Sequence, residues 1–576
     1  MKFIFLYSVL FTSLIVNAQI VKKDTLNVEV INVVKPFDPS VADAFKINRN
    51  PQLEQDSIGE HKPFKYTIFS VPVASTFTPK QIGFVGLVKP ELKTIYNNFI
   101  SAGYGNNQTP LVETFIHNAI KKNQDIGVYI NYLSSKGGVK NAVLNDAFTD
   151  AKLAVYYKQA QDQFDWQIDL GGQLQKYNWY GLSPILKPFD PILLASIHPQ
   201  QTYNTFNAGS SMIYHHAIFQ GGTFEYQYFS DDYSTSENRI FLAPEFKFPI
   251  FSDHLSTQLS LDYLDGKFNQ AYVNTNQLNY QFLTIGFYPN FELNRANLNL
   301  NLGLKVSYSS VSKTPQQSKF YFYPNLMASY KLKANGFTAF AGLTGDLHQN
   351  SYSEFANANN FVSPTLNIKR TNQQYKTFVG LKGLTNGVNF QLKVSYQNEK
   401  DKALFVSNPV KVISTNNKAY EYGNSFNVVY DNIKTLSLEA EAKVNFSKQL
   451  NFGGTFAFNN YNLSSQQEAW NLPQFKADLN ANYTLNKWFV KTEVYVVGQR
   501  KGQSSHIFST FTIATPQTVI QTAYVDLNFS GGYNFSDGFT VFARFNNVLN
   551  DNYQAFTNYE VQGFQALAGL TYKFDF

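Results

Sequence analysis

Residues 564–576 read FQALAGLTYKFDF, and this final stretch decides the fold. Apolar side chains recur there at every second position from Phe564 to Phe576, whereas Lys573 and Asp575 lie on the other parity. Side chains alternate between the two faces of a β-strand, so a period of two gives one apolar face and one polar face. The stretch therefore predicts an amphipathic β-strand that ends on an aromatic residue.

The same alternation recurs through most of the chain upstream. These stretches run to about 10 residues or more, whereas strands of soluble sandwiches average about 5 to 6 and membrane strands need roughly 9 to 11. Their length favours strands that cross a membrane. The clearest examples are residues 297–308, 436–446, 475–484 and 523–535.

Composition excludes several other classes of protein. The 576 residues are 16% aromatic and 15% charged, which does not fit a disordered chain or a coiled coil. A mean hydropathy of −0.27 is too polar for a bundle of membrane helices. Cysteine is absent, which excludes disulfides, cysteine-zinc sites, a thiol nucleophile and a lipoprotein cysteine. The net charge of +6 is too balanced to indicate nucleic acid as a partner.

The N-terminus has the pattern of an export signal. Lys2 precedes a mostly apolar stretch over residues 3–16, and the VNA motif at 16–18 matches a small-residue cleavage site. The apolar stretch is too short for a membrane-spanning helix. We expect residues 1–18 to be a signal peptide and the mature protein to lie outside the cytoplasm.

Two further regions differ in composition. Residues 19–90 are rich in proline and poor in aromatics, which predicts an extended periplasmic segment. Residues 91–576 carry the alternating stretches and most of the aromatics, and they predict a transmembrane antiparallel up-and-down β-barrel.

Loop asymmetry supports the barrel and gives a strand count. Ten short polar turns, such as 122–124 and 385–387, alternate with longer connections, as expected when short turns face the periplasm. Ten turns that each join two strands, with a first and a last strand, predict about 22 strands, with residues 430–435 open to assignment as loop or strand. Trp166 and Trp488 follow short turns, where an interfacial aromatic belt is expected. The long connections are 177–203, 349–374, 407–424 and 499–521.

The end of the chain resembles the closing hairpin of TonB-dependent receptors. Residues 538–550, the loop through Asn552 and Tyr553, and the terminal strand share its Asn-rich element and its Tyr-x-Phe ending. The resemblance implies an outer-membrane barrel in a Gram-negative cell. It also implies that the barrel assembly machinery reads the terminal aromatics Tyr572, Phe574 and Phe576.

The resemblance also raises the question of what fills the barrel. The family carries a folded plug before its first strand, and residues 19–90 are too short for one and lack its glycine-rich motifs, so we expect no full plug domain. A short tract resembles the TonB-binding box near a receptor's mature N-terminus, although a partner-docking strand fits it equally. The tract comprises Asp24, Thr25, Leu26, Val28 and Val30.

Two functions are open. The first is a receptor-type or transport-type barrel for solute passage, closed by the N-terminal segment or by loops 177–203 and 349–374. The second is a non-transporting subunit of an outer-membrane complex, an assembly or envelope scaffold that docks outer-membrane or periplasmic proteins through residues 19–90. Candidate lumen-facing residues for the first are Lys476, Asp478, Lys491, Glu493, Asp526 and Arg544.

Catalysis is disfavoured by the sequence. The eight histidines are dispersed, and no nucleophile motif, zinc-ligand spacing, phosphate loop or dinucleotide fingerprint occurs. We therefore predict no enzymatic activity, no metal site and no cofactor. The expected partners are outer-membrane lipids and proteins.

Overall fold

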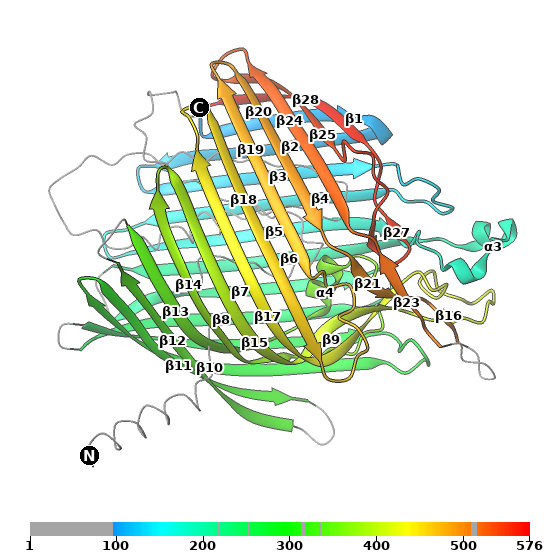
Figure 1. The fold of residues 1–576 in the computed structure, drawn as a ribbon, viewed down its shortest axis with the longest axis horizontal. Coiled ribbons are helices and arrows are strands. Elements are labelled where there is room, and N and C mark those ends of the chain that lie inside the picture. The colour runs from blue at the N-terminus through cyan, green and yellow to red at the C-terminus, as the bar shows by residue number, and fades with distance from the viewer. Residues whose placement is uncertain (1–95, 216–217, 251–252, 313–316, 333–335, 509–514) are drawn as a thin grey trace.

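A computed structural model describes residues 96–576 except 216–217, 251–252, 313–316, 333–335 and 509–514. The chain forms one closed antiparallel barrel of 22 strands (Figure 1). The first strand, β1 (Asn98–Gly105), pairs with the last, β28 (Gln565–Phe574), in a register that joins Asn98 to Phe574. The predicted all-β barrel and its strand count are confirmed.

Each strand of the barrel pairs with its neighbours in sequence. The first half continues through β2 (Thr109–Lys121), β3 (Gln124–Ser135), β4 (Phe148–Ala160), β5 (Phe164–Asn178), β6 (Gln200–Tyr214), β7 (Phe219–Asp231), β8 (Ser236–Ile250), β9 (Asp253–Phe268) and β10 (Leu278–Arg295). The second half comprises β11 (Leu298–Val311), β12 (Gln317–Lys331), β13 (Phe337–His348), β14 (Thr371–Thr385), β15 (Val388–Ser407), β17 (Phe426–Asn445), β18 (Leu450–Leu463), β19 (Phe475–Leu485), β20 (Trp488–Val497), β24 (Tyr524–Asn534) and β25 (Phe539–Asn546).

Short elements occupy the long connections. The helices are η1 (Asn106–Gln108), η2 (Pro184–Leu186), α3 (Pro191–Ser196) and α4 (Tyr352–Ala358). The strand pairs are β16 (Val410–Lys411) with β22 (Ile507–Phe508), β21 (Arg500–Gln503) with β23 (Thr518–Gln521), and β26 (Gln554–Phe556) with β27 (Tyr559–Glu560). Among the residues that the structure describes, no helix is long and apolar enough to cross a membrane.

Short turns gather at one end of the barrel and long loops at the other. The turn between β14 and β15 shows why: Thr385 pairs with Val388, and Asn386 and Gly387 between them have φ values of 47° and 79°. Positive φ at both central positions is what the tightest hairpin turns require, and Asn-Gly supplies it. Both termini of the barrel lie at the short-turn end, which is the periplasmic end in outer-membrane barrels.

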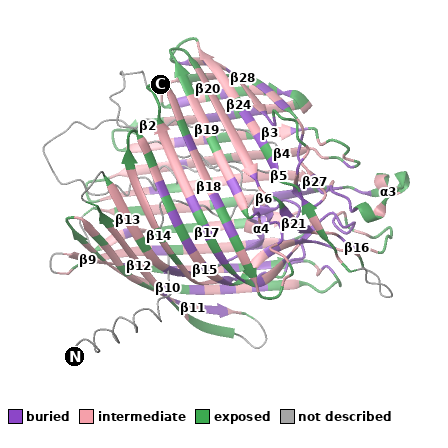
Figure 2. Ribbon diagram, viewed as in Figure 1, coloured by how far each residue is buried: buried purple, intermediate pink, exposed green. Residues whose placement is uncertain are grey.

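Burial is inverted relative to a soluble protein (Figure 2). Leu436 and Leu438 on β17 are 48% and 44% exposed, whereas Glu439, on the other parity of the same strand, is 3% exposed. Trp488 is 59% exposed beside a short turn and packs on Tyr533, with ring centroids 4.8 Å apart. The apolar parity therefore faces outward, and the polar parity faces the interior.

The segment left open by the sequence is part of a strand. Residues 430–435 lie within β17, and Tyr430 and Thr435 pair with Ala403 and Gln397 of β15. A bulge in β15 between Glu399 and Lys402 accommodates the irregular stretch. Of the two assignments that the sequence left open, the strand is therefore the right one, and it is 20 residues long.

Candidate functional site

Five long connections close the end of the barrel opposite the termini. We call their described residues the lid, and α4 in Figure 1 lies within it. They follow β5, β13, β15, β20 and β25, and comprise residues 179–199, 349–370, 408–425, 498–523 without the gap, and 547–564.

One aromatic cluster joins the lid to opposite walls of the barrel. Phe229 of β7, Phe426 of β17 and Tyr524 of β24 belong to the same buried cluster as the lid residues Trp179 and Tyr420. β7 lies across the ring from β17 and β24, so side chains from these strands can share a cluster only inside the lumen. The lid is therefore a packed core built across the mouth of the barrel.

Hydrogen bonds tie the connections to one another. The indole of Trp179 donates to the carbonyl of Phe361 at 3.1 Å, and the side-chain amide of Asn424 donates to the carbonyl of Trp179 at 2.9 Å. The ring of Phe361 stacks on Tyr559 with centroids 3.6 Å apart, and the Tyr559 hydroxyl donates to the carbonyl of Asn424. Four of the five connections are thus linked around Phe361, so the lid behaves as one unit.

A buried carboxylate attaches α4 to the wall. Glu237 of β8 is 1% exposed and accepts from the backbone N–H groups of Tyr352 and Ser353, at 2.7 and 3.1 Å. The Tyr280 hydroxyl also donates to it, at 2.6 Å. The first N–H groups of a helix lack partners within the helix, so a carboxylate placed there is favourable.

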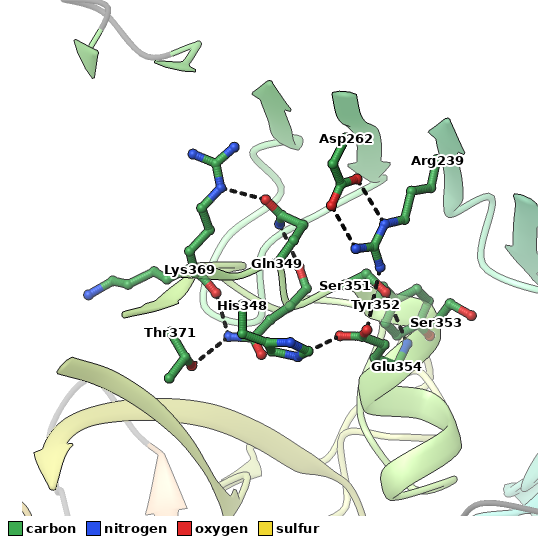
Figure 3. Close-up of polar contacts among 12 residues, drawn as sticks. Arg239, Asp262, His348, Gln349, Ser351, Tyr352, Ser353, Glu354, Lys369 and Thr371 are labelled. Carbon is green, nitrogen blue, oxygen red and sulfur yellow. Dashed lines mark hydrogen bonds and ion pairs between the residues drawn. The ribbon is translucent and has the colours of Figure 1, made fainter. Parts of the chain in front are cut away.

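A second set of charges surrounds the same helix (Figure 3). Arg239 of β8 donates to both oxygens of Asp262, at 3.0 and 2.8 Å, and lies 3.4 Å from Oε1 of Glu354. His348 Nε2 lies 3.3 Å from the other oxygen of Glu354. Burial works to raise the pKa of Glu354, but attraction to His348 and Arg239 outweighs it and holds that pKa below its ordinary value. We call Glu237, Arg239, Asp262, His348 and Glu354 the latch.

The lowered pKa of Glu354 gives the latch a pH dependence. A carboxyl group whose pKa is depressed in the closed lid contributes above its ordinary pKa of 4.5 and loses this contribution as the pH falls through the lowered value. We expect acid to loosen α4 from the wall. The chain has no cysteine, so spin labels can be attached at Asn357 and Lys448 alone. We expect a wider distribution of the distance between them at pH 3 than at pH 7.

Two variants make the pH prediction specific. Glu354→Gln should be loosened at pH 7 and should lose most of the response to acid. Glu292→Gln, an exposed carboxylate at the short-turn end, should respond as the wild type does. Equal responses in the wild type and in Glu354→Gln would show that Glu354 does not set the pH dependence.

A glycine occupies an irregularity in β13, shortly before the chain leaves the wall. The β13–β14 register shifts between Thr344 and Asp346. A Cβ at Gly345 would lie 2.5 Å from the Tyr323 ring and 2.6 Å from the carbonyl oxygen of Gln373. Only glycine fits this approach, and the irregularity comes shortly before the connection that carries α4.

The six candidate lumen-facing residues lie on four neighbouring strands. The register aligns Asp478 with Tyr495 and Tyr495 with Asp526, and it aligns Lys491 with Ser530, which in turn pairs with Arg544. The alternate parity carries Leu479 and Val525, which are exposed. The register thus brings the six together as one polar strip on a single face, comprising Lys476, Asp478, Lys491, Glu493, Asp526 and Arg544.

The other predicted sites lie elsewhere. The tract that resembles a TonB box, residues 24–30, falls outside the described residues, as do the signal peptide and the periplasmic segment. Tyr572 and Phe576 are exposed at 55% and 83%, and Phe574 packs between them. Their role as an assembly signal stays a prediction.

Sequence reasoning missed the latch. None of its residues was among the candidates, because its partners come from β8, β9, the end of β13 and the β13–β14 connection, far apart in sequence. One local signal exists: Ser351 accepts from the backbone N–H of Glu354 at 3.1 Å, so the Ser-x-x-Glu pattern of a helix start marks α4.

Comparisons with known proteins find structures of similar fold. No protein-family model and no curated protein matches the chain. The FrpB iron transporter from Neisseria meningitidis (F3-3 variant) is 11% identical with a TM-score of 0.64, covering 84% of this chain and 82% of its own. The siderophore receptor PirA from Acinetobacter baumannii is 14% identical with a TM-score of 0.59, covering 83% and 80%. The copper transporter OprC is 12% identical with a TM-score of 0.58, covering 84% and 81%.

These likenesses show that the chain has the 22-stranded barrel fold of TonB-dependent receptors. The closed barrel and the Gram-negative outer-membrane receptors that it resembles place the protein in the outer membrane. The similar structures are transporters and receptors, which fits a protein without enzymatic activity.

Proposed function

We propose that this outer-membrane barrel passes a solute across the membrane and that the lid is its outer gate. The observation that carries the proposal is the lid itself, a packed aromatic core that includes side chains of the wall and that is also tied to the wall by buried charged groups at α4. A lid that served only to seal the barrel could be attached by apolar packing alone. The latch instead concentrates charged groups at one helix, which is an arrangement that can be released.

The polar strip on β19, β20, β24 and β25 supports passage through the lumen. It carries both signs of charge on the face opposite the exposed apolar side chains. The iron, siderophore and copper proteins that share the fold are transporters or receptors by name. We propose the same class of activity here, with residues 1–18 as signal peptide and residues 19–90 as a periplasmic segment in place of a full plug domain.

Planar-bilayer recording tests the proposal with four proteins. These are the mature chain, a chain lacking residues 19–90, a chain with residues 350–369 replaced by a short Gly-Ser linker, and the double variant. We expect stepwise conductance from the double variant, in which the β13–β14 connection is replaced and residues 19–90 are absent. The variant in which only the connection is replaced should conduct as well, unless residues 19–90 block the lumen. Heat-modifiable mobility on a denaturing gel checks that each barrel is folded.

The alternative is a non-transporting subunit of an outer-membrane complex. The packing of the protein's own loops across the mouth favours it, because a scaffold needs no open path. Silence of all four folded proteins in the bilayer would overturn the transport proposal in its favour. Co-purification of outer-membrane or periplasmic proteins that depends on residues 19–90 would then identify the docking segment.

A further inference from the structure

A buried cation of the wall lies near a buried cation of the lid. Lys476, at the start of β19, is 9% exposed and pairs with Val497, and Arg500, three residues after Val497 in β21, is 1% exposed. Nζ of Lys476 and Nε of Arg500 are both enclosed, and neither has a hydrogen-bond partner among the residues that the structure describes. The charge that acts on Lys476 is that of Arg500, which has the same sign.

Arg500 is held in place by neutral groups. Its terminal nitrogens donate to the carbonyls of Ala555 and Gln554 in the lid connection that follows β25. Its guanidinium lies 5.5 Å from the ring of Tyr524, which stacks on Tyr553 with centroids 3.7 Å apart. These contacts fix the orientation of Arg500 and leave Nε without an acceptor.

The carboxylates on the same face form no ion pair with either cation among the described residues. Asp526 accepts from the Tyr553 hydroxyl at 2.8 Å through one oxygen, whereas its other oxygen has no hydrogen-bond partner there. The interactions of Asp478 are with Asn480 and Tyr495. Within the described part of the chain, no carboxylate therefore neutralises Lys476 or Arg500.

We propose that Nζ of Lys476 and Nε of Arg500 form a binding site for a small anion, a halide or a single carboxylate group. Burying an unpaired ammonium group is strongly unfavourable, and an anion that accepts from both donors removes that penalty. Both donors are enclosed, so the anion is small. Because Arg500 bonds to the lid connection 547–564, the occupied site holds that connection against the wall.

The anion can come from two sources, the solution or a carboxylate of residues 19–90. The anion site is an inference separate from the proposed passage of solute. Only its effect on gating rests on the proposed function. The hydrogen–deuterium exchange rate of peptides from residues 547–564 reports whether the site is occupied, because an occupied site should hold this connection against the wall. The mature chain is compared at one pH and one ionic strength in sodium chloride, in sodium formate, and in a buffer with only a bulky organic anion.

We expect chloride or formate to slow exchange of this connection in a saturable way, by about ten-fold at an anion concentration ten times Kd. Lys476→Met should abolish the dependence on anions, and Lys476→Arg should keep it. Lys487→Met, in the short turn that follows β19, should behave as the wild type does. If instead the mature chain is insensitive and removal of residues 19–90 creates the dependence, the anion is a carboxylate of that segment.

Equal responses in the wild type and in folded Lys476→Met would overturn the site, because the effect would then be general screening. Insensitivity of the wild type, of the chain lacking residues 19–90 and of Lys476→Arg would overturn it as well. These results are independent of bilayer conductance. If the anion has no effect but the lid variant conducts, only the anion site is wrong. If the anion slows exchange but no variant conducts, only the proposed function is wrong.

Discussion

Replacement of Glu237 with alanine is expected to release α4 from the barrel wall. The substitution removes a buried carboxylate that accepts from two backbone N–H groups and from the Tyr280 hydroxyl. Hydrogen bonds to a charged group contribute about 1.5–3 kcal/mol each. Even a net loss of about 3 kcal/mol shifts the ratio of open to closed lid by roughly a hundred-fold. Spin labels at Asn357 and Lys448 should show a broad population of new distances.

Two further variants complete this experiment. Glu237→Gln keeps one acceptor oxygen and the size of the side chain, so its effect should be intermediate. Glu292→Ala removes an exposed carboxylate at the short-turn end and should leave the distances unchanged. A narrow, wild-type distribution in folded Glu237→Ala would show that the aromatic cluster alone holds the lid.

Replacement of Trp179 with alanine is expected to loosen the lid through its core. Trp179 is fully buried, lies 5.7 Å from the ring of Tyr233 and 5.6 Å from that of Tyr420, and donates to the carbonyl of Phe361. Deleting such a side chain from a packed core costs about 3–5 kcal/mol. Hydrogen exchange of residues 349–370 should accelerate by roughly a hundred-fold or more, whereas the barrel strands keep their protection.

Trp488→Ala is the matched control for Trp179→Ala. Trp488 is 59% exposed at the short-turn end and touches no lid residue in its aromatic contacts, so its loss should leave exchange of the lid unchanged. Acceleration confined to the strands in Trp179→Ala, with the lid protected, would contradict the description of the lid as a separate packed unit.

The barrel could be predicted because its signals are local. Alternation along one strand, such as 564–576, fixes which side chains face outward, and Asn386-Gly387 fixes a turn without reference to any other part of the chain. The strand count followed from the same local features. Four of the five long connections were also found, because they interrupt the alternation.

The site could not be predicted in the same way. The contacts of Glu237 with Tyr352 and of Trp179 with Phe361 join residues more than a hundred positions apart. Nothing in the residues around Glu237 distinguishes it from other polar-parity carboxylates on the barrel, such as Glu439, which pairs with Lys393. The parity of each strand was enough to propose the residues of the polar strip, but their neighbours in the lid, such as Arg500, depend on how the connections fold back.

The pairing of β1 with β28 sets the order in which this protein can mature. Asn98 must meet Phe574, so the two edges that seal the ring are almost the first and the last parts of the barrel to leave the ribosome. Contacts between such distant residues form slowly, because ring closure restricts most of the chain at once. Until then, each half-built barrel has two open edges able to pair with other chains. The closed ring therefore cannot form until nearly the whole barrel sequence is available.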